Sequence, residues 1–156
     1  MQGFQLSGIE YGQFRHLFML PDDQLRAQGA IRRIATESPG FPCRVSLQDA
    51  EVGEELILLP YLHQDTVSPY RASGPIFVRR NAKQKTLEIG EVPTYVTRRQ
   101  ISVRAYDSAD MMIGATVCDG SEAGREIEQF FESPDVGYIH LHNAKQGCFS
   151  CSVQRA

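Results

Sequence analysis

The residues best suited to chemistry lie close to the C-terminus of this sequence. His140 and His142 are two positions apart in YIHLHN, and Cys148 follows after a short turn. On a strand, side chains two positions apart point to the same face, so both imidazoles can face one ligand. A Cys148 thiol with either histidine as its base would be a nucleophile of the kind used in covalent catalysis. Asn143 would orient the reacting groups, and Cys43 is the alternative nucleophile.

Three other interpretations of these residues stay open. His140, His142 and Cys148 offer nitrogen and sulfur ligands that suit zinc, and His63 or Cys43 would complete the set. Structural zinc sites usually show two tight ligand pairs, and because this spacing does not, we assign no metal. A Cys-x-x-Cys redox pair is disfavoured, since a strand lacks the helix N-terminus that activates such thiols. These cysteines and histidines can also serve packing alone.

Arginine outnumbers lysine by thirteen to three. Arginine grips carboxylates and phosphates with two parallel hydrogen bonds, so Arg44, Arg71 and Arg104, on or beside loops, could form an anion site. In the loop SPYRASG, Tyr70 and Ser73 add hydroxyl groups next to the arginine. The loop is not a P-loop, because it lacks the Gly-Lys-Ser/Thr ending and the following helix. The alternative is a structural turn whose arginine pairs with a nearby carboxylate.

Two predicted hairpins carry most of these candidates. Strand patterns at 100–107 and 111–120 are joined by a three-residue turn, and a C-terminal hairpin covers 136–152. Along 100–107, apolar and polar residues alternate, so one face of that strand is expected to be buried and the other polar. Residues 38–44 contain two prolines and a glycine, which predict an irregular segment leading into a strand at 45–47.

An apolar stripe predicts the main helix at about 120–132, and Pro134 closes it. Short helices are predicted at 11–19 and 22–28. We therefore expect an α+β fold, in which a largely antiparallel sheet of about six strands packs on this main helix and on one or two short N-terminal helices.

Composition and charge exclude several classes of partner. The 156 residues are 42% hydrophobic and 22% charged, which is typical of one globular domain spanning 1–156. A net charge of -3 disfavours nucleic acids and anionic membranes as partners. The longest apolar run is too short to cross a bilayer. The first residues lack the features of a secretory signal, so we expect a cytoplasmic protein whose four cysteines are thiols.

Four separated motifs carry a family resemblance: PGFPCRVSLQDA, SPYRASGPIFVR, RAYD and YIHLHNAKQGCF. With them, the sequence resembles the bacterial family known as domain of unknown function 1203, from Phe4 to Arg155. The resemblance implies a cytosolic single domain and no particular reaction, because the family has none assigned. It draws attention to the motif residues Cys43, Arg44, Tyr70, Arg71, Gly74, Arg104, Tyr106, Asp107, His140, His142, Asn143 and Cys148.

Two functions are compatible with the sequence. In the first, loops 38–44 and 68–74, strand 100–107 and hairpin 136–152 form one pocket that binds a small anionic ligand and supports cysteine or histidine chemistry. In the second, the protein is a non-enzymatic module that dimerises or binds a protein through a sheet edge or the end at Met111 and Met112. No cofactor follows from these residues, and enzyme status stays open.

Overall fold

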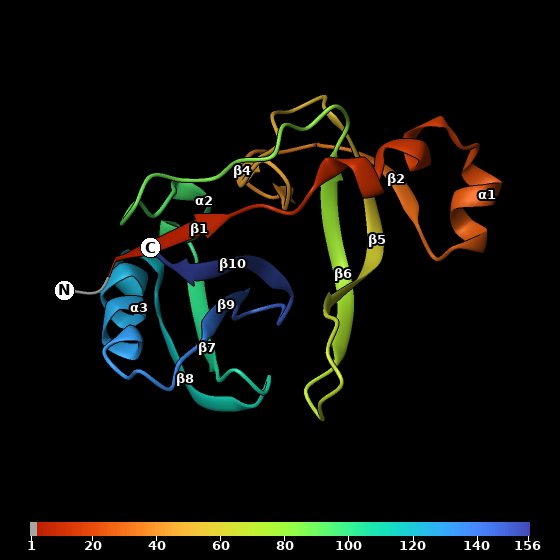
Figure 1. The fold of residues 1–156 in the computed structure, drawn as a ribbon. Helices are drawn as coiled ribbons and strands as arrows, with labels where there is room; N and C mark the ends of the chain where they lie inside the picture. Colours follow the sequence, from red (N-terminus) through yellow and green to blue (C-terminus); the bar gives the residue numbers. More distant parts are fainter. Residues whose placement is uncertain (1–2) are drawn as a thin grey trace.

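The computed structural model describes residues 3–156, which form ten strands in two five-stranded sheets (Figure 1). In spatial order, sheet A consists of β1 (Phe4–Ser7), β10 (Phe149–Arg155), β9 (Tyr138–Asn143), β7 (Gln100–Tyr106) and β8 (Met112–Asp119). Sheet B consists of β2 (Ile31–Ile34), β5 (Glu55–Gln64), β6 (Ala72–Arg79), β3 (Pro42–Cys43) and β4 (Gln48–Asp49).

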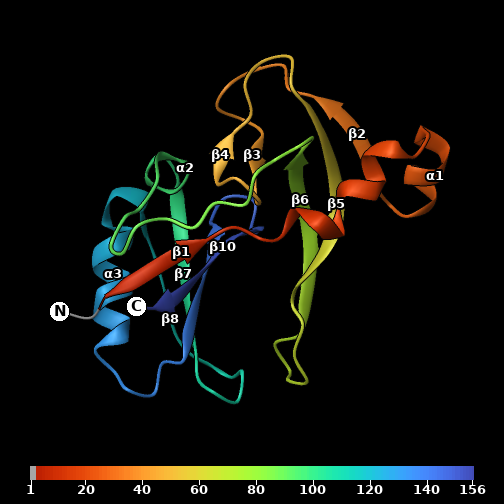
Figure 2. The same ribbon diagram turned by 45° about the horizontal axis from the view of Figure 1, so that its top comes forward.

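Each sheet has its own helical cover, and the two covers lie at opposite ends of the molecule (Figures 1 and 2). The helix α3 (Ala123–Phe131), preceded by the 3-10 turn η3 (Gly120–Glu122), packs on sheet A. Sheet B is covered by η1 (Tyr11–Gln13), η2 (Arg15–Met19) and α1 (Asp22–Ala27), whereas the short α2 (Thr94–Thr97) precedes β7. Within residues 3–156, no helix is long and apolar enough to cross a membrane.

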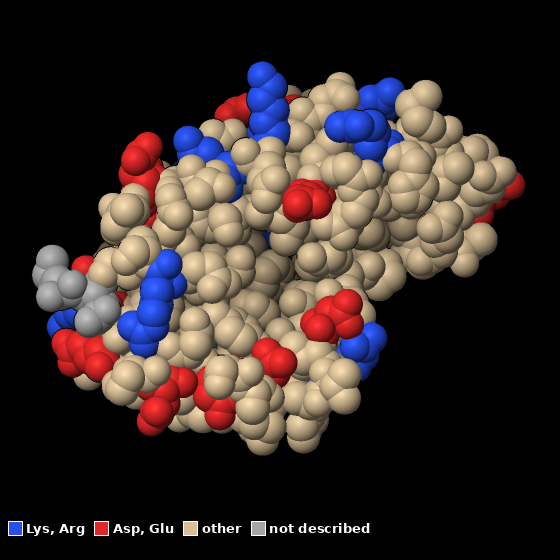
Figure 3. Space-filling view, viewed as in Figure 1, with Lys and Arg blue, Asp and Glu red and all other residues tan. Residues whose placement is uncertain are grey.

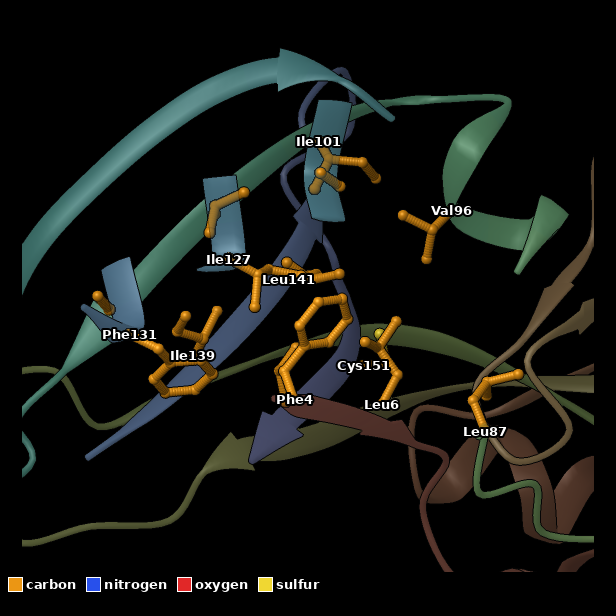
Figure 4. Close-up of a cluster of buried hydrophobic side chains, with 14 of the residues drawn as sticks. Phe4, Leu6, Leu87, Val96, Ile101, Ile127, Phe131, Ile139, Leu141 and Cys151 are labelled. Carbon is orange, nitrogen blue, oxygen red and sulfur yellow. The ribbon is translucent and has the colours of Figure 1, made fainter. Parts of the chain in front are cut away.

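Strand periodicity explains the core between sheet A and α3. The predicted alternation along β7 is confirmed, because Ile101, Val103 and Ala105 are fully buried while the residues between them are only partly buried. Every fourth residue along α3 is buried against this face, ending in Phe131. Figure 4 shows Ile101, Ile127 and Phe131 among the side chains that gather in this cluster, with the sulfur atom of Cys151.

The predicted α+β fold, with a single sheet of about six strands on one main helix, is wrong. The strands divide between two sheets, because β5 and β6 pair with each other, and β5 pairs further with β2 and β6 with β3, rather than with β7 to β10. Hydrophobic periodicity predicts that a segment is a strand but does not say which remote strand it pairs with.

The expectation for 38–47 is also wrong. Pro42 and Cys43, expected to be irregular, form β3, which pairs with β4 and through Cys43 with Phe77 of β6. Residues 45–47, expected to be a strand, form a turn in which Leu47 has a φ of 52°. The proline fits because it starts the strand.

The β9–β10 hairpin joins the two halves of the molecule, which are sheet A and sheet B, each with the helices packed on it. Its tip extends from sheet A toward β6 in both ribbon views (Figures 1 and 2). The tip is fixed there by hydrogen bonds from Arg44, which follows β3, to the carbonyl oxygen of Phe149 and the sulfur of Cys148. The surface is hollowed where the two halves meet (Figure 3).

Gly120, at the start of η3, provides a test of how η3 packs against α2 and the residues that follow it. A Cβ atom at this position would overlap the carbonyl oxygen of Val96 and lie 2.6 Å from that of Arg99. We expect Gly120→Ala to reduce the free energy of unfolding by about 3 kcal/mol, measured by urea denaturation. Gly12→Ala is the control, because no atom lies within 4 Å of its Cβ, and it should change stability by less than about 0.5 kcal/mol. Equal effects of the two substitutions would contradict this packing.

Candidate functional site

A cavity of about 890 Å³ is lined by residues of both sheets, and we call it the Arg44 pocket. The loop before β3, the outer face of the β5–β6 hairpin, the segment from α2 to β7, η3 and the β9–β10 turn all contribute to its wall. Its lining residues are Pro39, Gly40, Pro42, Arg44, Leu58, Pro75, Phe77, Thr97, Arg98, Arg99, Gln100, Asp119, Gly120, Ser121, Asn143, Lys145, Gln146 and Cys148.

Arg44 is the most unusual residue of this pocket, because it is charged and only 2% exposed. Its Nε donates to the carbonyl oxygen of Phe149 at 2.7 Å, and its Nη1 donates to that of Pro42 at 2.6 Å. Its Nη2 lies 3.0 Å from the Sγ of Cys148. Within residues 3–156, Arg44 makes no ion pair. Because guanidinium has five N–H groups, two remain unused.

The rest of the pocket wall adds positive charge. Arg98 and Arg99 both bind the carboxylate of Asp49, and Arg99 also donates to a backbone carbonyl group. Lys145, on the β9–β10 turn, is exposed and makes no ion pair within residues 3–156. The pocket lining holds four basic side chains against one acidic side chain, that of Asp119, and Asp49 behind the lining offsets part of the charge of Arg98 and Arg99.

Two groups from the β9–β10 hairpin complete the region around Arg44. Cys148 is half-buried, and its Sγ lies 3.8 Å from the Nδ2 of Asn143. Asn143 is 4% exposed, and its Oδ1 has no hydrogen-bond partner although it is buried. No imidazole in the described part of the chain is hydrogen-bonded to Cys148. The predicted pairing of this thiol with a histidine base is therefore not present.

The histidines form a separate group, which we call the histidine cluster: His63, His140 and His142 around the ring of Phe149. Ring centroids are 5.0 Å apart for His63 and His142, and 6.3 Å apart for His63 and His140. Phe149 stacks on His63 at 5.3 Å. One nitrogen of each imidazole is buried without a hydrogen-bond partner. In residues 3–156, no three His, Cys, Asp or Glu side chains are arranged to hold a metal ion.

Burial keeps the histidine cluster neutral. Burial, with smaller effects of the nearby His63 and Arg104, lowers the pKa of His140 to about 4. Burial likewise lowers the pKa of His142 to about 3. The Nδ1 of His142 lies 3.0 Å from the carbonyl oxygen of Gly147, so in the neutral ring this nitrogen carries the proton. The Nε2 of His142 is then left as an acceptor.

Tyrosines extend this cluster along sheet A. Tyr106 stacks on Tyr138 at 5.1 Å and contacts both Tyr70 and His140 edge-on. The Tyr138 hydroxyl donates to Asp110 at 2.6 Å. Aromatic and neutral groups therefore dominate this side of the β9–β10 hairpin, whereas basic groups dominate the Arg44 pocket.

The predicted site residues do not meet in one pocket. Arg44, Asn143 and Cys148 lie together in the Arg44 pocket, whereas Arg104, Tyr70, His140 and His142 lie in or beside the histidine cluster. The remaining three belong to neither group: Arg71 is exposed and binds Asp65 at 2.7 Å, Ser73 is exposed on β6, and Cys43 is buried in the core of sheet B.

Three basic residues of the Arg44 pocket and one histidine of the cluster are not among the predicted site residues. Arg98, Arg99 and Lys145 line the pocket, and only the arginine doublet in the sequence could have drawn attention to the first two. His63 was considered only as a fourth metal ligand, although its ring contacts both other imidazoles of the cluster.

A family model described as "Protein of unknown function (DUF1203)" matches residues 40–155. The chain belongs to this family. The DUF1203 match begins later than the expected Phe4, so η1, η2 and α1 lie outside it, whereas the Arg44 pocket from Gly40 onward and the whole histidine cluster lie inside. No curated protein and no solved structure gives a significant match to this DUF1203 chain.

The neutral histidine cluster predicts a loss of stability in acid. Because the pKa values of His140 and His142 are lower in the folded protein than the ordinary 6.5, the unfolded chain binds more protons below that pH. The free energy of unfolding therefore keeps its full value above about pH 6.5 and decreases as the pH falls toward 4. At pH 5 the decrease is about 2 kcal/mol for each histidine. We expect His140→Gln to flatten this dependence in urea unfolding between pH 7.5 and pH 5.

The matched control is His16→Gln, since His16 is exposed on η2 and outside the cluster. It should keep the wild-type dependence. If His140→Gln and His16→Gln gave the same slope of stability against pH, burial of neutral imidazoles would not be the cause.

Proposed function

We propose that this protein binds a small anionic ligand in the Arg44 pocket. The proposal rests mainly on Arg44, whose buried guanidinium group has no ion-pair partner in residues 3–156 and has two unused N–H groups. A charge buried without a counter-ion is costly, and an anion in the pocket would offset that cost. The unpartnered Oδ1 of Asn143 is an acceptor, so the anionic ligand is expected to carry a hydrogen-bond donor as well.

Charge and size also support an anion. The pocket lining is positive although the whole chain has a net charge of -3. On the face seen in Figure 3, acidic and basic side chains are both present across the surface. A volume of about 890 Å³ is within the range of small-molecule pockets.

The proposed pocket is formed by fewer of the segments than the sequence led us to expect. Its wall includes residues of loop 38–44, Gln100 at the start of β7 and the β9–β10 turn. Loop 68–74 is not part of it, so Arg71 takes no role in the proposal. Arg98 and Lys145 take that role instead, because both are exposed cations in the pocket wall.

Binding can be tested with inorganic phosphate and citrate as probes. We expect each to raise the Tm of the full chain by about 3–5 °C at ten times its Kd, relative to chloride at equal ionic strength. The double variant Arg98→Gln/Lys145→Gln should raise the Kd of both probes by about tenfold or more, measured by calorimetric titration. The control is Arg71→Gln/Lys83→Gln, which also removes one exposed arginine and one exposed lysine, but at positions outside the pocket.

The control is needed because phosphate and citrate also stabilise proteins non-specifically by exclusion from the surface. Such an effect would be equal in the two double variants. The proposal fails if neither probe stabilises the protein beyond chloride, or if both double variants respond as the wild type does.

The second candidate function is self-association through the edge of sheet A. The strand β8 lies at that edge, and Ile113 and Val117 on it are 46% and 62% exposed. Unpaired backbone groups and exposed apolar side chains on an edge strand favour pairing with another strand. Met111, which precedes β8, is exposed as well.

This candidate predicts a dimer in sedimentation equilibrium from micromolar to millimolar concentration. Val117→Lys should make the protein monomeric, because it adds a charge to the edge strand. Thr36→Lys is a matched control on an exposed residue outside sheet A. A wild-type chain that stays monomeric over the whole range would rule the candidate out.

A further inference from the structure

Cys148 has the surroundings of a reactive thiol. Its sulfur lies at the wall of the Arg44 pocket, 3.0 Å from a guanidinium nitrogen of Arg44 and 3.8 Å from the amide nitrogen of Asn143. Hydrogen bonds from a cation stabilise negative charge on the atom that accepts them. Reactive cysteines are found in such electropositive, partly exposed places, and it is the thiolate that attacks.

A second observation points to a ligand in the pocket that this sulfur lines. Asn143 lines the same pocket, is more than nine-tenths buried, and its Oδ1 has no partner. Nearly all buried side-chain oxygens in proteins are hydrogen-bonded. The Nδ2 of this amide faces the sulfur, and its Oδ1 is left as an acceptor for a donor group on a molecule bound in the pocket.

The other three cysteines have surroundings that disfavour reaction. Cys43 is fully buried, and its sulfur accepts the backbone N–H of Arg79 at 3.3 Å. Cys151 is buried in the core of sheet A, where burial raises the pKa of its thiol to about 12. Burial and the nearby Glu126 raise the pKa of Cys118.

The same facts determine what kind of product Cys148 can give. All four cysteines are free thiols, and Cys43 and Cys151 are buried in hydrophobic clusters to which Cys148 does not belong. A bond formed at this sulfur therefore ends on a small molecule. The cations of Arg98 and Lys145 in the pocket wall favour a molecule that carries carboxylates.

We propose that Cys148 is a nucleophilic thiol that undergoes exchange with small disulfides carrying carboxylate groups, bound in the Arg44 pocket. The thiol proton first passes to water. The Cys148 thiolate then attacks one sulfur of the disulfide, a new sulfur–sulfur bond forms, and the old one breaks. The other half of the small molecule leaves as a thiolate, so no further oxidant or reductant is needed. This inference rests on the proposed anion-binding function.

Two disulfides of opposite charge test the inference on the native full-length chain: oxidised glutathione, which is anionic, and cystamine, which is cationic. Intact-mass spectrometry gives the rate of mixed-disulfide formation, and peptide mapping gives the cysteine. We expect glutathione to be added at Cys148 about tenfold faster or more than at the other cysteines, and not at all at this position in Cys148→Ser.

Charge selectivity is measured as the ratio of the glutathione rate to the cystamine rate. Arg98→Gln/Lys145→Gln should lower this ratio by about tenfold, whereas Arg71→Gln/Lys83→Gln should leave it unchanged. Both pairs are exposed, so the folded protein is expected to persist in each. Arg44 itself is not varied, because its buried hydrogen bonds hold the hairpin in place.

The outcomes separate the two proposals. A Cys148 that reacts with neither disulfide, in a protein that still binds phosphate, overturns the nucleophile and leaves anion binding intact. A Cys148 that reacts equally with both disulfides, with no effect of the pocket variants on the ratio, overturns the preference for carboxylates. Absence of both phosphate binding and charge selectivity overturns the anion pocket itself.

Discussion

One buried guanidinium group determines how the two halves of the molecule meet. Arg44 belongs to the turn after β3 in sheet B, and two of its three hydrogen bonds are to residues of the β9–β10 hairpin in sheet A. A buried cation has to be satisfied by acceptors, so the hairpin tip and the turn after β3 must lie close together. The cavity at this junction, and the cations in its wall, take their positions from that requirement.

The hairpin tip also separates two chemical environments. The adjacent residues Cys148 and Phe149 have different surroundings: the sulfur contacts Arg44 and Asn143, and the aromatic ring contacts the three imidazoles. Charge collects around the first, whereas the imidazoles around the second are kept neutral by burial and by the nearby Arg104. Cys148 and the two histidines, which lie within nine positions of one another in the sequence, therefore have separate surroundings in the structure.

Local features of the sequence predicted local features of the structure. The alternation along β7 and the shared face of His140 and His142 follow from the period of a strand and are confirmed by burial and ring contacts. The division into two sheets was not predicted, because strand pairing depends on contacts between distant segments.

The candidate site shows the same limit. Arg44 and Phe149 are 105 positions apart, and no local pattern joins them. His63 reaches the other imidazoles only through the packing of β5 against the β9–β10 hairpin. The irregularity in β10 was equally invisible: Phe149 pairs with His142 and Cys151 with Leu141, so Ser150 has no partner on β9.

This extra residue in β10 supplies the anchor points of the junction. The carbonyl groups at the irregularity accept hydrogen bonds from side chains, that of Phe149 from Arg44 and that of Ser150 from Tyr95. An inserted residue of this kind also reverses which face the following side chains occupy, which is why Phe149 meets the histidines while Cys151 enters the core. The contact between sheets A and B thus depends on the number of residues in β10 as much as on their identity. A deletion here would place the side chains on the two sides of it on the same face of β10 and remove a carbonyl group that Arg44 or Tyr95 uses, even if every remaining side chain were kept.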